Sequence, residues 1–165
     1  MMNKYKIIDV CALFLLMLIT GVFWGTWFTL TRSLETFSAE EFIHIGQTII
    51  ANVAMPMRII MPSGVLMMAL SLRNAGNKQT ASFIYGIVSL VLIIGVLLIT
   101  LLVLVPIDKV IREGSVSTIP ADWDSIRKPW DLFHSIRTFA SLASFVCFSI
   151  YLLTQPENRN SKQGY

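Results

Sequence analysis

The sequence predicts an all-α fold: a transmembrane antiparallel four-helix bundle with a proline-kinked second helix, built as one membrane domain over residues 1–165. Three observations predict it. Hydrophobic residues make up 55% of the chain and charged residues only 14%, against roughly 25% in soluble domains. Four stretches approach or exceed the about 20 apolar residues that a helix needs to cross a bilayer. Two of them are apolar on every side, as helices surrounded by lipid are.

The first and third spans are the clearest. Residues 10–30 contain no charged side chain, so we expect the first span over about residues 8–31. A basic start precedes it, as in a signal peptide, but no small-residue cleavage site follows, so we expect an uncleaved helix. The third span is expected over about residues 80–105, within an uncharged run that ends at Asp108.

The second span is expected over about residues 39–72, longer than a membrane requires. It begins with a capping box, in which the Ser38 hydroxyl caps a backbone N–H and Glu41 reaches back. Pro56 and Pro62 lie inside it and should kink the helix, because proline lacks an N–H and crowds the preceding turn.

The fourth span is expected over about residues 130–153, after a bend at Pro129. Residues 106–129 then form the one long connection, and residues 154–165 form a polar tail. Short connections between the other spans favour antiparallel neighbours, as in a simple bundle.

The distribution of basic residues bears on orientation. Four spans place both termini on one side, and the two sides carry nearly equal numbers of basic residues. Lys4 and Lys6 precede the first span, and the turn at 73–78 has two bases and no acid. The positive-inside rule therefore favours both termini in the cytoplasm of a multi-pass protein of the plasma or bacterial inner membrane.

Charge and cysteine content argue against a nucleic-acid-binding protein, a disulfide-stabilised scaffold and a cysteine metal site. The net charge of +3 is small and scattered, so no nucleic-acid partner is expected. Cys11 and Cys147 lie in apolar runs and predict neither a disulfide framework nor a metal site. No cofactor is expected, and the expected partners are membrane lipid, a small planar hydrophobic ligand, and a second copy or another membrane protein.

Costly polar side chains are predicted to gather at the non-cytoplasmic end of the bundle. A polar stripe follows the second helix. On the fourth helix, the residues with the spacing of one face are Trp130, His134, Arg137, Ser141 and Ser144. Asp108 ends the third span near the same end. His134 and Arg137 are the catalytic candidates. The ligand-binding candidates are Trp24, His44, Gln47, Arg58, Asp108 and Trp130.

Each candidate has a structural alternative. An arginine near mid-bilayer costs about 2.5–3.5 kcal/mol on insertion scales. Arg58 is therefore expected to pair with Glu41, Asp108 or carbonyls freed by Pro62. Arg137 is expected to pair with Asp108 or Asp131. The alternatives are that these arginines reach the membrane interface or that at least one binds an anionic or quinone-like ligand. His134 is a candidate general base, hydrogen-bond donor or metal ligand, or else a histidine bonded to a backbone carbonyl.

Several short motifs carry a family resemblance. The chain resembles a widespread, largely uncharacterised family of small four-helix integral membrane proteins grouped with the anthrone oxygenases. The resemblance covers nearly the whole chain and rests on Gly21-Val-Phe-Trp-Gly25, the proline-containing second helix, Val105-Pro-Ile-Asp108, Trp123, Trp130, His134 and Arg137.

The resemblance implies a chemistry. Anthrone oxygenases convert an anthrone to an anthraquinone with dioxygen. If that chemistry applies here, His134 is the implied base and Arg137 the group that steadies the phenolate. Many relatives have Asn after the Val-Pro pair, whereas this chain has Asp108, an acid that changes the charge of the site and favours pairing with Arg137.

Three functions follow from these observations. The first is a small polytopic membrane protein with a ligand-binding polar cluster at its outer end. The second is a cofactor-independent oxygenase acting on a planar phenolic or quinol substrate. The third is an accessory subunit that contacts other membrane proteins and uses the polar cluster as an internal brace.

Overall fold

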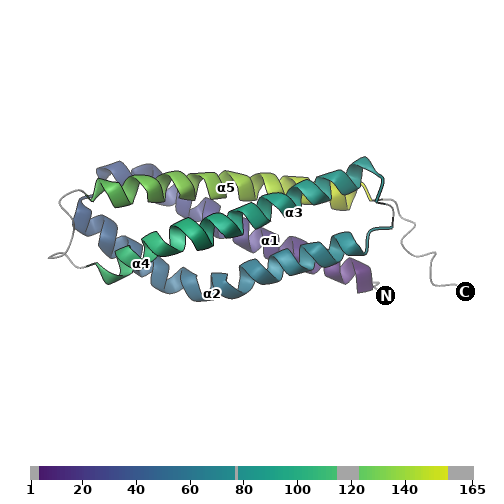
Figure 1. Cartoon of the computed structure of the whole chain (residues 1–165), viewed down its shortest axis with the longest axis horizontal. Helices are drawn as coiled ribbons and strands as arrows, with labels where there is room; N and C mark the ends of the chain where they lie inside the picture. The colour runs from purple at the N-terminus through teal and green to yellow at the C-terminus, as the bar shows by residue number, and fades with distance from the viewer. Residues whose placement is uncertain (1–3, 77, 115–122, 156–165) are drawn as a thin grey trace, which may run out of the picture.

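The long helices form one antiparallel bundle (Figure 1). The computed structural model describes residues 4–76, 78–114 and 123–155, and in these ranges it contains helices and no strand. Four helices are long and apolar enough to cross a membrane. The beginning of the first and the end of the last lie at the same end of the bundle. The predicted fold class is thereby confirmed.

The first two helices begin close to where the sequence places them. Helix α1 covers Lys4–Thr29, and the 3-10 helix η1 covers Thr31–Thr36. Helix α2 covers Ala39–Arg73 and starts with the predicted capping box of Ser38 and Glu41. The cap satisfies backbone N–H groups that have no partner within the helix.

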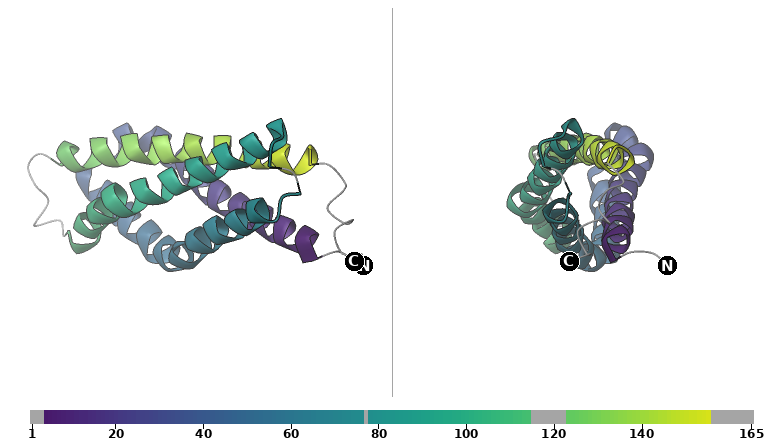
Figure 2. Two further views of the ribbon diagram at one scale, coloured as in Figure 1. Left: turned by 45° about the vertical axis from the view of Figure 1, so that its right-hand side comes forward. Right: turned by 90° about the vertical axis from the view of Figure 1, so that its right-hand side faces the viewer.

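Helix α2 is not straight. Figure 2 shows it bowing outward at mid-length, in the region that contains Pro56 and Pro62. Each proline removes one backbone hydrogen bond and pushes against the preceding turn, so two of them within seven residues bend the helix. The predicted kink is confirmed.

The third span is longer than predicted. It consists of α3 (Ala81–Ile99), a π-helical turn η2 (Thr100–Leu104) and α4 (Val105–Glu113), which we call together the third helix. The sequence suggested that a loop begins at residue 106, but the helix continues beyond Pro106. The wide π turn directly before it accommodates the proline ring, which would crowd a regular α-turn.

Helix α5 covers Asp124–Leu153 and begins earlier than predicted, with Pro129 inside the helix. The helical segments α4 and the start of α5, the latter in a stretch whose sequence resembles a helical run-in, therefore shorten the connection that the sequence suggested. Most of the predicted polar tail, from residue 156 onward, lies outside the described residues.

Small and hydroxyl-bearing residues hold α3 against α5. Ser89 Oγ donates to the Ser144 carbonyl at 2.7 Å, and Ser144 Oγ donates to the Ser89 carbonyl at 2.9 Å. Because lipid is as apolar as a leucine core, close packing and hydrogen bonds of this kind drive helix association in a membrane. Gly86 lies on the same face and lets Tyr151 and Leu72 approach the backbone.

We expect the Gly86→Leu variant to be destabilised by about 1–3 kcal/mol, because a Cβ at this position would overlap Leu72 Cδ2 and lie 3.0 Å from the Tyr151 ring. Thermal unfolding in detergent measures the effect. Gly95→Leu on the same helix is the control, because nothing lies within 4 Å of its Cβ position. Equal melting temperatures of the two variants would contradict this account of the packing.

Candidate functional site

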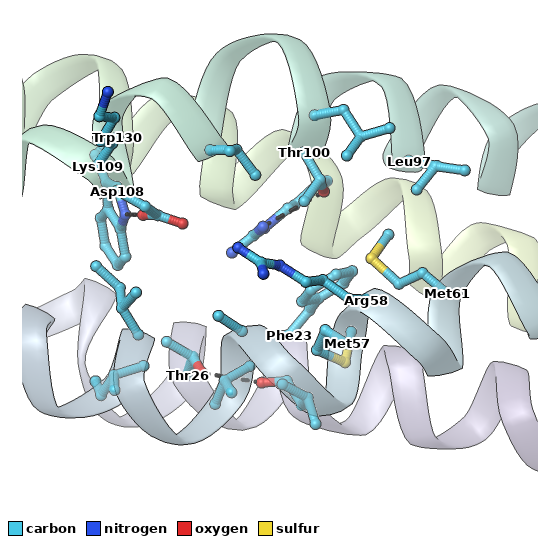
Figure 3. Close-up of a pocket in the computed structure, with 18 of the residues that line it drawn as sticks. Phe23, Thr26, Met57, Arg58, Met61, Leu97, Thr100, Asp108, Lys109 and Trp130 are labelled. Carbon is cyan, nitrogen blue, oxygen red and sulfur yellow. Dashed lines mark hydrogen bonds between the residues drawn. The ribbon is translucent and has the colours of Figure 1, made fainter. Parts of the chain in front are cut away.

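A cavity of about 310 Å³ lies inside the bundle, in the half away from the termini (Figure 3). All four long helices contribute to its wall. Most of the wall is apolar and includes aromatic and sulfur-containing side chains, among them Phe23, Met57, Met61 and Trp130. Its volume is at the lower end of the about 300–1,000 Å³ typical of small-molecule sites, so it suits a compact ligand.

The charged groups of the cavity are mostly cationic. Arg58, Lys109, Arg112 and Arg137 line it, and Asp108 is the single acidic residue among the described residues that line it. An excess of positive charge in an apolar-walled site attracts an anion, because the low dielectric strengthens the attraction.

Arg137 is held by a chain of contacts. Its Nη2 and Nε lie 2.8 Å and 3.2 Å from His134 Nδ1, and Nη1 lies 3.4 Å from Thr100 Oγ1. Its guanidinium carbon lies 4.4 Å from the centre of the Phe23 ring, a cation–π distance. The predicted ion pairs of Arg137 with Asp108 or Asp131 are not formed, and Asp108 acts on it only from a distance.

His134 lies behind Arg137 and does not line the cavity. Its side chain is 1% exposed, and its ring stacks on Trp130 with ring centres 5.0 Å apart. Since Nδ1 accepts from Arg137, the ring proton is assigned to Nε2. Nε2 makes no hydrogen bond of normal geometry to any described residue. The histidine is therefore placed to orient Arg137 rather than to touch a ligand.

Asp108 lines the same cavity as Arg137 without forming an ion pair with it. Its Oδ1 accepts a hydrogen bond from Trp130 Nε1 at 3.1 Å, and Figure 3 shows its carboxylate directed into the cavity. The hydrogen bond fixes the indole, which in turn covers His134. Asp108 occupies the first turn of α4, where the unexpected continuation of the third helix places it.

Arg58 extends from the bowed part of α2, and Figure 3 shows its guanidinium reaching into the cavity. Within the described part of the chain it forms neither a hydrogen bond nor an ion pair, so the predicted pairings with Glu41 and Asp108 are not formed. Arg58 thus presents free hydrogen-bond donors inside an apolar wall.

Three other predicted ligand-binding residues lie elsewhere. Trp24 stacks on Trp27 at the outside of α1, with ring centres 5.3 Å apart. His44 is exposed, and Gln47 Nε2 donates to the backbone carbonyl of Gly114 at 2.8 Å. Gln47 therefore joins α2 to the end of α4, while Arg58, Asp108, Trp130 and Arg137 are the predicted residues that the fold brings together around the cavity.

Some lining residues were missed by sequence reasoning. Thr100 is the only polar residue between Ser89 and Asp108, and this isolation was a usable signal. Lys109 and Arg112 were assigned to a loop because the amphipathic pattern of residues 105–113 was not recognised as helix. Nothing in the sequence distinguishes Phe23 from its apolar neighbours.

The described residues contain no group of three His, Cys, Asp or Glu side chains that could hold a metal ion.

Comparison with known families shows which family the chain belongs to. The anthrone oxygenase family matches residues 48–147. The chain belongs to this family. No curated protein and no solved structure matches it.

The range that matches the anthrone oxygenase family contains most of the residues that line the cavity. It includes Arg58, Asp108, Trp130 and Arg137, and thus the walls from most of α2, the third helix and most of α5. The wall from α1, with Phe23, lies outside the matched range. The region shared with the anthrone oxygenases is therefore the one that carries the charged groups of the cavity.

Proposed function

We propose that this anthrone oxygenase family member binds a planar phenolic or enolisable ligand as its anion and oxygenates it with dioxygen, without a cofactor. The observation that supports this most is the pair of guanidinium groups, Arg58 and Arg137, in an apolar-walled cavity with a single carboxylate. An arginine at bilayer depth is costly unless it meets a partner, and an anionic oxygen is such a partner.

The shape and lining of the cavity favour a compact aromatic ligand. Phe23 and Trp130 offer flat faces or edges for ring contacts, and the methionines adapt to irregular outlines. A fused-ring system with one acidic oxygen can place its rings against these side chains and its oxygen against the cations. Anthrone, the substrate after which the family is named, has this form as its enol tautomer.

The proposed reaction balances with dioxygen as the only co-reactant. Loss of a proton from the methylene carbon of the anthrone gives an enolate, which the arginines stabilise. The enolate transfers one electron to dioxygen, and the resulting radicals combine into a carbon-bound peroxide. The peroxide takes up the first proton and becomes a hydroperoxide. Removal of the second C–H proton then breaks the O–O bond, expels hydroxide and leaves a ketone, and the hydroxide takes up that proton to form water. One anthrone and one dioxygen give one quinone and one water.

Asp108 and His134 have different roles in the proposed reaction. Asp108 is the one carboxylate among the lining residues, and we assign to it the acceptance of the first proton. The role is specific to chains with an acid here, since an amide could not accept the proton. His134, the base that the resemblance implies, is instead a positioning residue that holds Arg137 through Nδ1.

The proposal is tested with the protein reconstituted in lipid nanodiscs and supplied with anthrone in oxygenated buffer. We expect quinone absorbance to appear with uptake of one dioxygen per quinone. Asp108→Asn is expected to reduce turnover about 10²–10⁴-fold, the usual contribution of a general base. The same variant should bind the anthrone anion more tightly, because an opposing negative charge is lost. Glu113→Gln, outside the cavity lining, is the control.

Two outcomes overturn parts of the proposal. Absence of both binding and quinone formation by the wild-type protein excludes the proposed substrate class. Undiminished turnover of Asp108→Asn excludes Asp108 as the proton acceptor. The proton is then lost to water, and the arginines act only by stabilising the enolate.

We also propose that both termini are cytoplasmic. The bases before α1 and in the turn at 73–78 support this orientation under the positive-inside rule. The cavity, which lies in the half away from the termini, would then occupy the outer half of the membrane.

A further inference from the structure

The geometry points to a lateral opening between α2 and the third helix, through which a neutral, membrane-dissolved phenol reaches the cavity from the bilayer. We call the residues that border it, Arg58, Pro62, Leu101 and Val105, the portal. The nature of the ligand rests on the proposed function, but the opening itself rests on how these two helices pack.

The two helices touch near both ends. Toward the termini, Leu72 lies so close to Gly86 that its Cδ2 would overlap any Cβ placed there. At the other end, Gly46 lies against Ile111, and Gln47 bonds to the carbonyls of residues 111 and 114. The helices are antiparallel, so these contacts pin them at two levels.

Between these contacts, the cavity is bordered by side chains that are also exposed. All four portal residues line the cavity and are also exposed, with Leu101 at 53% and Val105 at 44%. Lys109 and Arg112 line the cavity and are exposed as well, so the exposed edge of the third helix continues from the portal toward the end of the bundle. A side chain that borders a cavity and is also exposed marks the place where the cavity opens. Because the helices are antiparallel, the two end contacts put Arg58 and Leu101 at about the same level.

Two local features of the chain open this gap. The prolines bow α2 away from its neighbours at this level (Figure 2). On the opposite side, the π turn Thr100–Leu104 widens the third helix at the same level. Both features disturb regular helix pairing, and neither disturbs the contacts at the two ends.

The portal lies at the depth of the hydrocarbon core of the bilayer. Both helices carry their other charges toward the ends, with Glu40 and Arg73 on α2 and Lys109 and Arg112 toward the end of the third helix. A core of about 30 Å covers about 20 residues of helix, so the middle of each helix lies in the acyl region. Three of the four portal residues are apolar, as a lipid-facing opening requires.

The end of the bundle nearer the cavity is closed by side chains. A buried cluster that includes Leu34, Phe42, Leu104 and Ile111 packs between the cavity and that end. A hydrophobic phenol dissolved in lipid therefore has a shorter apolar path through the portal than through this cluster. Once inside, its hydroxyl meets Arg58, which lies at the threshold and favours the ionised form.

The test measures access to a thiol placed in the cavity. The background is Cys11→Ser and Cys147→Ala, which removes both native cysteines, and Met57→Cys supplies the target. The protein in phosphatidylcholine vesicles is treated with N-phenylmaleimide, which dissolves in the bilayer, or with an anionic sulfonate methanethiosulfonate, which remains in water. We expect N-phenylmaleimide to react at least 10-fold faster, relative to each reagent's rate with a free thiol.

A matched pair of variants locates the opening. Leu101→Trp should slow the reaction with N-phenylmaleimide at least 10-fold, because the indole fills the portal. Leu102→Trp adds the same bulk one residue away, on a side chain that is 71% exposed and does not line the cavity, and should leave the rate unchanged. Val105→Trp provides a second block if Leu101→Trp does not fold.

The outcomes separate this inference from the proposed function. Equal rates for Leu101→Trp and Leu102→Trp, or preferential labelling from water, overturn the portal whatever the protein does with anthrone. A portal effect on labelling without anthrone turnover overturns the proposed function and leaves the portal standing. If both hold, Leu101→Trp should also lower the rate of quinone formation from vesicle-dissolved anthrone, and Leu102→Trp should not.

Discussion

Replacing Arg58 by methionine is expected to raise the melting temperature of the protein in detergent and to weaken binding of the anthrone anion about 10- to 100-fold. The gain in stability follows because the guanidinium has no partner among the described residues and lies at bilayer depth, where its charge is costly. The loss of affinity follows because a hydrogen bond to a charged group contributes about 1.5–3 kcal/mol. A functional residue that reduces stability is the expected signature of a binding site.

Thermal unfolding and ligand titration on the same preparation measure the two effects. Arg73→Met, at the end of α2 and outside the cavity lining, is the control and should change neither quantity by much. If Arg58→Met lowers stability and leaves affinity intact, Arg58 belongs to the scaffold and the cavity has a different purpose.

Replacing Arg137 by methionine is expected to reduce turnover by about 10²–10³-fold, the usual effect of removing one donor that stabilises a developing oxyanion. The loss in stability should be modest, because exchange of a buried charge for an apolar side chain of similar size is often nearly neutral. The unpaired Nδ1 of His134 is the main cost, about 1–3 kcal/mol. Arg137→Lys keeps the charge but loses the fork that joins His134 to Thr100, so it should retain only part of the activity.

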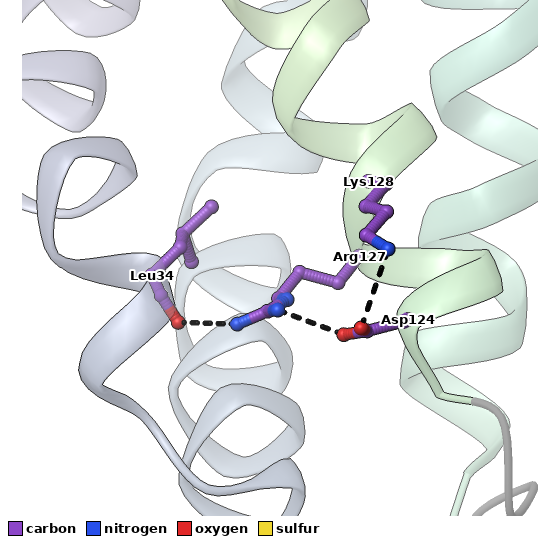
Figure 4. A network of polar contacts seen from close by, with 4 residues as sticks. All are labelled: Leu34, Asp124, Arg127 and Lys128. Atoms are coloured by element: carbon purple, nitrogen blue, oxygen red, sulfur yellow. Dashed lines mark hydrogen bonds and ion pairs between the residues drawn. The ribbon is translucent and has the colours of Figure 1, made fainter.

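Arg127, on the same helix, is expected to behave in the opposite way, because its loss should lower stability and leave turnover unchanged. Arg127 Nη1 donates to the Leu34 carbonyl at 3.1 Å and Nη2 lies 2.8 Å from Asp124, which joins η1 to the start of α5 (Figure 4). Lys128 lies 3.5 Å from the same carboxylate. Arg127→Met should therefore lower stability by about 1–3 kcal/mol through the unsatisfied carbonyl and leave turnover per folded molecule unchanged.

Comparison of the two variants distinguishes an active site from an internal brace. A brace predicts that Arg137→Met, like Arg127→Met, loses stability while turnover per folded molecule stays unchanged. An active site predicts a loss of turnover for Arg137→Met alone. The cavity of about 310 Å³ beside Arg137 supports the second result, since a brace needs no space for a ligand.

Much of the architecture could be predicted from local chemistry. The absence of charge over residues 10–30, the Ser38 cap and the prolines of α2 are properties of neighbouring residues, and each has the predicted consequence. The spacing of Trp130, His134, Ser141 and Ser144 also predicted one inward face of α5, and all four side chains are buried. Continuation of the third helix through Pro106 was missed, because the π turn that permits it has no strong sequence signal.

Local sequence patterns were enough to predict four spans, their caps and bends, and the presence of costly cations among them. The packing of the helices was needed to show that Arg58 faces the cavity while His44 and Gln47 do not, and that His134 lies behind Arg137. Lipid and protein interior are equally apolar, so the apolar side chains that form most of each helix do not fix how that helix is rotated. The rotation is fixed by contacts between residues distant in sequence, such as Gly46 with Ile111 and Gly86 with Tyr151.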